Sequence, residues 1–112
     1  MISKVVLQQL NAIESEMKRI GFWSSTPPDL QSQLQAGEIK SFLDAPSFEL
    51  WLQCVFIPNA RKATQNDTLP DQSQVSLMAA RQYDYHSIVE KAQPLLTLLE
   101  DFDALINNTR PN

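Results

Sequence analysis

The chain has 112 residues, of which 43% are hydrophobic and 20% are charged, and its formal net charge is −4. This length suits one globular domain over residues 1–112, and the composition argues against general disorder. The negative charge disfavours direct nucleic-acid binding, because such binding needs Lys and Arg side chains to displace counterions from phosphates.

Residues 2–20 predict the first helix. Apolar residues recur there at spacings of three and four and form one stripe, namely Ile2, Val6, Leu10, Ile13, Met17 and Ile20. Gly21 follows the stripe, and a glycine at this place ends a helix in the left-handed backbone region. We therefore expect a helix with one buried face and one solvated face.

Residues 24–41 predict a long loop. Polar residues dominate this segment, and Pro27 and Pro28 cannot lie inside a helix. A short helical turn around Leu30 and Leu34 is the alternative. A connection of this length in a small domain either wraps the surface or moves.

Residues 48–57 have the sequence FELWLQCVFI, the most apolar segment of the chain. Residues 55–57 favour strands, but no second β-rich segment exists that would pair with them. As a helix the segment is apolar on all sides, so it must be covered on all sides. We predict a central helix that kinks or breaks at Pro58, which also displaces the carbonyl of Cys54.

Two more helices follow. A weaker one covers residues 75–82, and a strong apolar stripe covers residues 88–106. Pro94 either kinks the last helix or lies where that helix begins afresh near Gln93, and residues 108–112 form a frayed tail. Three to four main helices around a central apolar helix, with no β pattern, predict a small all-α helical bundle.

The residues that carry chemistry are sparse. Cysteine and histidine occur once each, at Cys54 and His86, whereas a structural zinc site needs about four such ligands. His86 and Glu90 would share a helix face, but they supply only half of a metal site. We expect no metal and no cofactor, and the lack of a paired nucleophile and base favours a non-enzymatic protein.

The sequence also predicts the compartment. No segment approaches the ~18–20 apolar residues that cross a bilayer, and the N-terminal apolar run is too short for a signal peptide. We therefore expect a cytoplasmic protein with no membrane contact.

Two surfaces are candidates for binding a protein partner. One is an interaction groove beside the proline kink, and the other is an acidic docking face on the last helix for a basic partner. The groove would use Trp51, Gln53, Cys54, Pro58, Arg61 and Lys62, and the acidic face would use Glu100, Asp101 and Asp103. The alternatives are full burial of the apolar helix, a homodimer formed through Trp51, and an acidic run that is only a solvated face.

Several short motifs resemble the YqcC-like family of small bacterial proteins. These are Trp51-Leu52-Gln53, Ile57-Pro58, Leu69-Pro70 and Asp103-Ala104-Leu105, and the chain departs from the family at Cys54, where a larger aromatic residue is expected. The resemblance implies an all-helical bundle of unknown biochemical function whose genes often neighbour a tRNA pseudouridine synthase. It provides no catalytic residues to carry over.

Two functions follow as hypotheses. The first is a non-enzymatic protein-interaction or accessory module, associated with tRNA pseudouridine modification through the family's gene neighbours. The alternative is a small-ligand-binding protein or enzyme with a pocket at the Pro58 kink, where Gln53 and the displaced carbonyl of Cys54 supply polar contacts.

Overall fold

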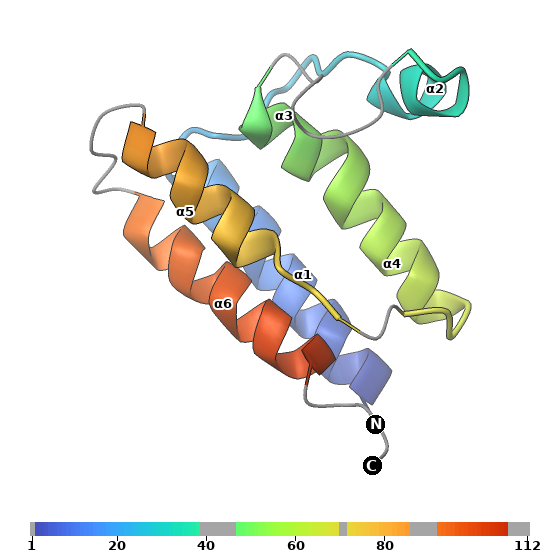
Figure 1. Cartoon of the computed structure of the whole chain (residues 1–112), viewed down its shortest axis with the longest axis vertical. Coiled ribbons are helices and arrows are strands. Elements are labelled where there is room, and N and C mark those ends of the chain that lie inside the picture. Colours follow the sequence, from blue (N-terminus) through green and yellow to red (C-terminus); the bar gives the residue numbers. More distant parts are fainter. Residues whose placement is uncertain (1, 39–46, 70–71, 86–91, 108–112) are drawn as a thin grey trace.

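The computed structural model describes residues 2–38, 47–69, 72–85 and 92–107. These residues form helices and connecting segments, and no strand occurs among them. In chain order the elements are α1 (Ile2–Arg19), α2 (Leu30–Gln35), α3 (Phe48–Trp51), the π-helix η2 (Leu52–Phe56), α4 (Ile57–Gln65), α5 (Val75–Tyr85) and α6 (Gln93–Asn107). The predicted all-α bundle is therefore confirmed (Figure 1).

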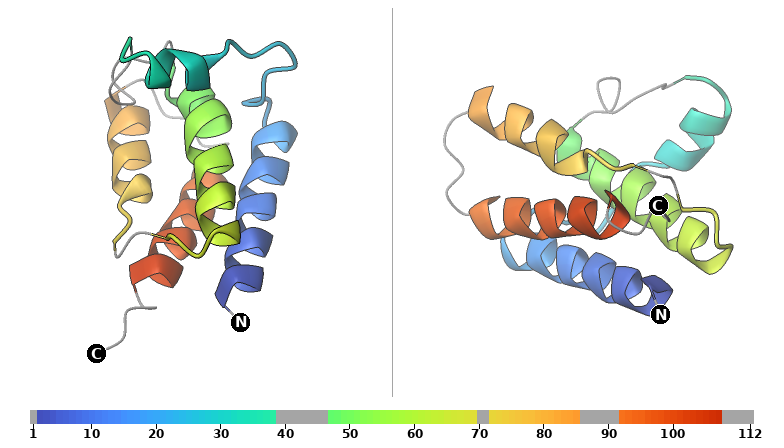
Figure 2. Two further views of the ribbon diagram at one scale, coloured as in Figure 1. Left: turned by 90° about the vertical axis from the view of Figure 1, so that its right-hand side faces the viewer. Right: turned by 60° about the horizontal axis from the view of Figure 1, so that its bottom comes forward.

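The long helices form an open arrangement. Helix α6 packs against α5 on one side and against α1 on the other, and α1 in turn packs against α4. The short helix α2 lies at one end and packs against η2. Figure 2 shows these helices from two further sides, and in its left-hand view α4 stands in front between α5 and α1. The series α5, α6, α1, α4 thus bends round without its two end helices packing along each other.

The main core lies inside this arrangement. It combines the apolar stripe of α1 with the inner faces of α5 and α6 and with one face of the 48–57 segment. Its fully buried large side chains include Leu10, Ile13, Met17, Leu52, Ile57, Leu95, Leu99 and Ile106. Val6, Leu10, Ile13 and Met17 of the predicted stripe therefore form the buried face of α1.

The 48–57 segment joins the main core through one face only. Phe48, Leu52 and Ile57 are buried in that core, whereas Leu50 and Trp51 are half-buried. The inner face of the segment packs in the main core, where Phe56 also meets Phe102 of α6, and its outer side packs on α2. A second group of apolar residues covers its outer side; we call this group the satellite cluster, and it consists of Leu30 and Val55 with Leu34, Leu50, Trp51 and Cys54.

Left-handed residues end three of the helices. Gly21 has φ of +82° after α1, and the Phe22 amide donates to the Met17 carbonyl at 2.8 Å, which together make a Schellman cap. Gly37 and Asp67 hold the same place after α2 and α4, with φ of +78° and +57°. The predicted helix stop at Gly21 is confirmed.

The predicted long loop contains a helix. Residues 30–35 form α2. Both prolines precede this helix, and Asp29 caps its first turn by accepting a hydrogen bond from the Ser32 amide at 3.1 Å. The alternative of a helical turn around Leu30 and Leu34 therefore holds. Residues 39–41, the last part of the predicted loop, lie outside the described residues, as do residues 42–46 that follow it.

The last helix begins at Gln93. Pro94 lies in its first turn. The amides of a first turn have no intrahelical acceptor, so the missing amide hydrogen of proline breaks no hydrogen bond there. Of the two alternatives for Pro94, a helix that begins afresh is the one observed in α6. The predicted part before residue 92 and the tail at 108–112 lie outside the described residues.

Candidate functional site

Pro58 creates an irregular turn in the middle of an 18-residue helical segment. Proline has no amide hydrogen, so in an α-helix the carbonyl of Cys54 would lose its donor. The chain widens to a π-helix just before the proline, where the Ile57 amide donates to the Leu52 carbonyl five residues back. A side chain from α2 supplies the missing donor, since Nε2 of Gln31 lies 2.8 Å from the Cys54 carbonyl oxygen.

The π-turn changes which aromatic side chains meet. In an α-helix residues five apart point about 140° away from each other, but the extra residue in a π-turn reduces that angle. Trp51 and Phe56 consequently lie on one side of the segment, with ring centroids 6.0 Å apart and an interplanar angle of 22°. Phe48 stacks on the other side of Trp51 at 5.9 Å, and Phe56 meets Phe102 of α6 edge to face at 5.1 Å.

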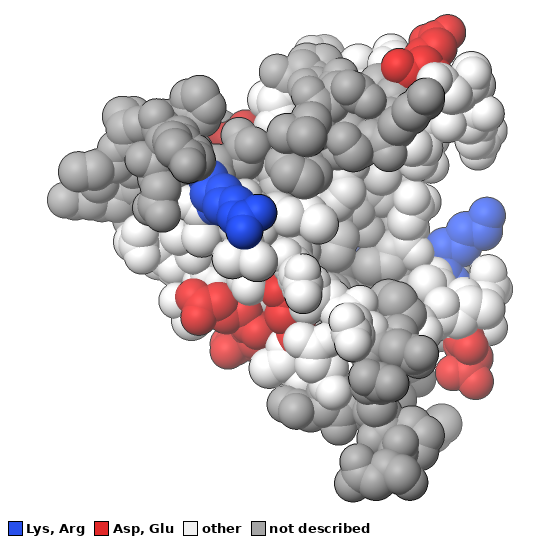
Figure 3. All heavy atoms as spheres, in the orientation of Figure 1, with Lys and Arg blue, Asp and Glu red and all other residues white. Residues whose placement is uncertain are grey.

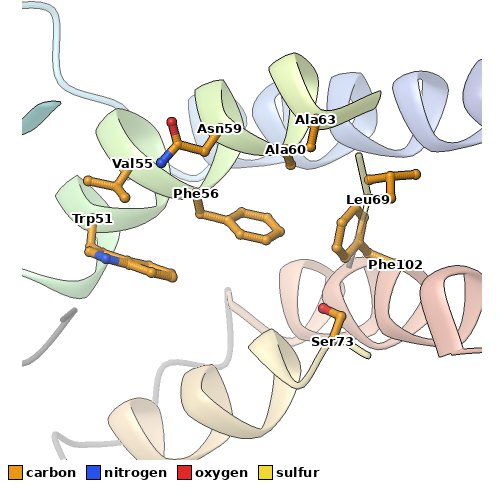
Figure 4. A pocket seen from close by; sticks show the side chains of 9 residues that line it. All are labelled: Trp51, Val55, Phe56, Asn59, Ala60, Ala63, Leu69, Ser73 and Phe102. Atoms are coloured by element: carbon orange, nitrogen blue, oxygen red, sulfur yellow. The ribbon is translucent and has the colours of Figure 1, made fainter. Parts of the chain in front are cut away.

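An apolar pocket of about 310 Å³ lies beside these rings. The helical segment lines one side through Trp51, Val55, Phe56, Asn59, Ala60 and Ala63, and the opposite side is formed by Leu69, Ser73 and Phe102. Figure 4 shows the ring of Phe56 turned toward Phe102, with which it makes its edge-to-face contact at one side of the pocket. The two alanines leave room where larger side chains on α4 would fill the gap, and none of the lining residues that the structure describes carries a charge.

Asp103 holds the pocket residue Ser73 and the start of α5 in place through hydrogen bonds. Its side chain is only 7% exposed, and its carboxylate accepts hydrogen bonds from the Val75 amide at 3.1 Å, from the Ser76 amide at 2.8 Å and from the Ser76 hydroxyl at 2.6 Å. The hydroxyl of Ser73 also donates to it. A carboxylate at this place satisfies the first amides of α5 and complements the positive end of its dipole.

Asn107 completes this attachment one turn further along α6. Its side-chain oxygen accepts a hydrogen bond from the Ser73 amide at 2.9 Å, and its nitrogen donates to the Ser73 carbonyl at 3.1 Å. Ser73 therefore reaches the pocket in a fixed position, held by two residues of α6.

The predicted acidic face is smaller than expected. Glu100 and Asp101 are exposed, and Figure 3 shows acidic side chains together over α6. Asp103 is buried and engaged with α5, so it is not part of this exposed surface. The sequence carried a signal for this, because Asp103 follows Leu99 by four residues and therefore lies on the apolar stripe.

The six residues of the predicted groove do not share one surface. Only Trp51 lines the pocket. Gln53 is 7% exposed and bonds both the amide and the carbonyl of Ser24 at 2.8 Å. Cys54 belongs to the satellite cluster.

The other three predicted groove residues lie on α4. Arg61 turns to α1, where it donates to Glu14 at 2.7 Å and to Asn11 at 3.0 Å, and Pro58 and Lys62 are exposed. The pocket residues that sequence reasoning missed follow helical spacing, with Phe56, Ala60 and Ala63 at i, i+4 and i+7. That spacing was a usable signal, but the small size of two members hid it.

The titratable groups near the π-turn are not poised for catalysis. Burial raises the pKa of the Cys54 thiol, and Asp29 raises it further, so the nucleophilic thiolate is disfavoured. On α1, the hydrogen bond from Lys18 lowers the pKa of Glu14, and Arg61 lowers it as well. That carboxylate joins two helices and has no contact with the pocket.

The described part of the chain contains neither a cluster of metal-ligating side chains nor a helix that could cross a membrane. No group of three His, Cys, Asp or Glu side chains comes together there to hold a metal ion. Among the same residues no helix combines the length and the apolarity that crossing a bilayer requires. His86 and Glu90, the half site considered from the sequence, lie outside the described residues.

Comparison with known proteins gives one match. A family model, DUF446, described as tRNA pseudouridine synthase C, matches residues 5–105. No curated protein and no solved structure matches the chain. The family match covers nearly the whole chain, whereas the YqcC-like label stays a prediction.

Proposed function

The chain belongs to the DUF446 family, and we propose that it is a non-enzymatic accessory module that binds a partner protein. The partner inserts an apolar side chain into the pocket between α4 and α6, and the complex serves tRNA pseudouridine modification.

The pocket is the observation that carries this proposal. Binding energy between proteins concentrates where a large side chain enters a desolvated pocket, and a preformed apolar concavity of about 310 Å³ offers such a place. Within the described ranges its polar lining residues are Asn59 and Ser73. The Ser73 hydroxyl donates to Asp103, whose carboxylate already accepts three hydrogen bonds from the first turn of α5, so this pair has a structural role.

The link to tRNA modification rests on the description of the family model, which names tRNA pseudouridine synthase C. The net charge of −4 supports a role beside a synthase in preference to direct tRNA binding. The partner that these two observations favour is a protein of the modification machinery.

A genetic experiment tests the proposal. A strain that lacks the gene is complemented with the wild type, with Ala60→Leu, which fills the pocket, or with Ala104→Leu. Ala104 is exposed on α6, about 200° around the helix from Phe102, so it is the matched control. Pseudouridine is then quantified by mass spectrometry at each position of the tRNA pool.

We expect pseudouridine to fall at one or more tRNA positions in the deletion strain. The wild type and Ala104→Leu should restore it, and Ala60→Leu should not. An unchanged pseudouridine content in the deletion strain would contradict the link to tRNA modification. Conversion of unmodified tRNA by the purified chain alone would contradict the non-enzymatic role.

The volume of the pocket favours a second candidate, a small-ligand-binding protein. Pockets for small molecules begin at about 300 Å³, and this one has about 310 Å³. The test is a thermal-shift screen of neutral metabolites against the wild type, Ala60→Leu and Ala104→Leu. A compound that stabilises the wild type and Ala104→Leu but not Ala60→Leu supports this candidate, and no stabilisation by any compound contradicts it.

The remaining parts of the proposal concern place and assembly. We place the protein in the cytoplasm, with exposed Glu100 and Asp101 as a secondary contact for a basic partner. A homodimer formed through the Trp51 side is the alternative use of the apolar surface. Light scattering at high concentration distinguishes the two, because a protein that remains at 12.7 kDa is no homodimer.

A further inference from the structure

We propose that the pocket selects an aromatic side chain of the partner, Phe or Trp, and that Asn59 holds the peptide group next to it. This inference rests on the proposed function, because both place a partner side chain in the same pocket. It adds the chemistry by which the partner is recognised.

The walls of the pocket are aromatic on both sides. Trp51 and Phe56 form one wall, with nearly parallel rings 6.0 Å apart, and Phe102 stands on the other, at 81° to Phe56. Aromatic rings prefer offset-stacked and edge-to-face contacts with centroids 4.5–7 Å apart. Phe56 and Phe102 already contact each other, so a flat ring that enters the pocket lies beside this pair and can make contacts of both kinds with it.

The lining also sets the charge of the occupant. No Asp, Glu, Lys or Arg stands among the described residues that line the pocket, and burying an unpaired charge is costly. A neutral side chain therefore fits this lining, whereas Arg or Lys would lose hydration with no carboxylate among the described lining residues to compensate for it. Of the neutral residues, Phe and Trp gain most from aromatic walls.

A chain of contacts orients a hydrogen-bond donor at the rim. Pro58 has no amide hydrogen to donate to the Cys54 carbonyl, and Nε2 of Gln31 donates to this carbonyl instead, at 2.8 Å. The same Nε2 lies 3.1 Å from Oδ1 of Asn59. A donor must face the oxygen of that amide, so the arrangement fixes which way the Asn59 side chain is turned.

The nitrogen of Asn59 is consequently left for the partner. Nδ2 donates to no residue within the described ranges, Asn59 is exposed, and Figure 4 shows it at the edge of the pocket. An amide donor beside a ring-shaped pocket matches a peptide carbonyl beside an aromatic side chain. Pro58 thus acts on recognition through Gln31 and Asn59, which are positioning residues in this account.

The first experiment compares two neutral probes on the wild-type protein by NMR titration. N-acetyl-phenylalaninamide carries an aromatic ring and peptide groups, and N-acetyl-cyclohexylalaninamide has the same groups with a saturated ring. We expect the aromatic probe to shift the amide resonances around Phe56, Ala60 and Phe102, and to bind about threefold to tenfold more tightly. Equal binding of both probes, or binding of neither, would overturn the aromatic preference.

The second experiment uses variants. Ala60→Leu should weaken the aromatic probe at least about tenfold, and Ala104→Leu should leave it unchanged. Asn59→Ala should weaken N-acetyl-phenylalaninamide about threefold to tenfold, as the loss of one neutral hydrogen bond does, and leave toluene unaffected. Equal effects of Asn59→Ala on both compounds would overturn the role of the amide.

Ala63→Leu serves as a second pocket-filling variant if Ala60→Leu does not fold, and the two-probe comparison needs no variant at all. The result of the probe-binding experiments is independent of the pseudouridine measurement. Normal pseudouridine in the deletion strain with selective probe binding refutes the proposed function alone. Loss of pseudouridine with no selective binding refutes only the aromatic preference.

Discussion

The main core and the satellite cluster both bury a leucine completely, Leu10 in the first and Leu30 in the second. They differ in extent. The main core joins α1, α5, α6 and one face of residues 48–57 along their lengths. The satellite cluster joins the six-residue α2 to the outer side of the same segment, and among the described residues it has two buried members, Leu30 and Val55.

Polar contacts compensate for the small apolar area of the satellite cluster. Gln31 of α2 donates to the Cys54 carbonyl, and Gln53 bonds both backbone groups of Ser24. An isolated helix of six residues is unstable in water, so α2 exists because side chains tie it to the π-turn. Regular apolar spacing holds one part of the molecule, and backbone groups freed by irregular structure hold the other.

The largest expected effect comes from truncating the two buried leucines. Leu10→Ala should lower the free energy of unfolding by about 3–5 kcal/mol, because the cavity lies between helices that cannot close over it. Leu30→Ala should cost at most about 2 kcal/mol, because α2 can separate while the main core stays folded. Urea unfolding measures both values.

Amide hydrogen exchange provides the control for this comparison. In Leu30→Ala, exchange should accelerate in α2 and not in α6, whereas Leu10→Ala should accelerate it throughout the slowest helices. Equal losses of stability for the two variants would show that the satellite cluster belongs to one cooperative unit with the main core.

The next effect separates two aspartates of α6. Asp103→Ala should cost about 2–4 kcal/mol, because it leaves the first amides of α5 and two serine hydroxyls without their acceptor. Asp101→Ala, an exposed control two residues earlier, should change stability by no more than about 0.5 kcal/mol. Thermal and urea unfolding of both variants provide the measurement, and similar losses would contradict the capping role.

These aspartates illustrate what the sequence could predict. The stripes of α1 and α6 repeat at three and four residues, so their buried faces followed directly from spacing. The helix stop at Gly21 and the helical character of residues 48–57 were also readable, because each depends on neighbouring residues. The capping role of Asp103 was not, because its partners lie about 30 residues away on α5.

The candidate site was harder to predict for the same reason. Sequence reasoning placed a kink at Pro58 and included Trp51, which does line the pocket. It assumed that the residues around the proline face one groove, but the π-turn shifts the register and sends Gln53 and Arg61 to other contacts. The far wall with Phe102 depends on how α6 packs, which no local pattern specifies.

A smaller effect tests whether Gln31 replaces the amide that Pro58 lacks. Gln31→Ala should cost about 1–2 kcal/mol in the wild type, because the Cys54 carbonyl loses its donor. In a Pro58→Ala background the new amide can take over, so the cost should fall by at least about 0.5 kcal/mol. Urea unfolding of the double-mutant cycle measures this coupling, and Gln35→Ala, exposed on the same helix, is the control. An additive cycle would mean that the two groups act independently.

The smallest effect concerns the ion pair that joins α4 to α1. Arg61 lies 2.7 Å from Glu14, and Lys18 lies 2.8 Å from the same carboxylate. The hydrogen bond from Lys18 and the contacts with Arg61 hold the pKa of Glu14 below its ordinary value of 4.5. A depressed pKa in the folded state means that the unfolded state takes up this proton first as the pH falls.

The contribution of Glu14 is therefore complete at neutral pH and disappears as the pH drops from about 4.5 through the lower folded value. Glu14→Gln should lower stability at pH 7 by at most about 1 kcal/mol, since the pair is partly solvated, and should equal the wild type in strong acid. Glu100→Gln, which removes an exposed carboxylate, is the control. Urea unfolding from pH 7 to pH 3 measures the difference, and a gap between Glu14→Gln and the wild type that does not close in acid would rule out the carboxylate charge as its source.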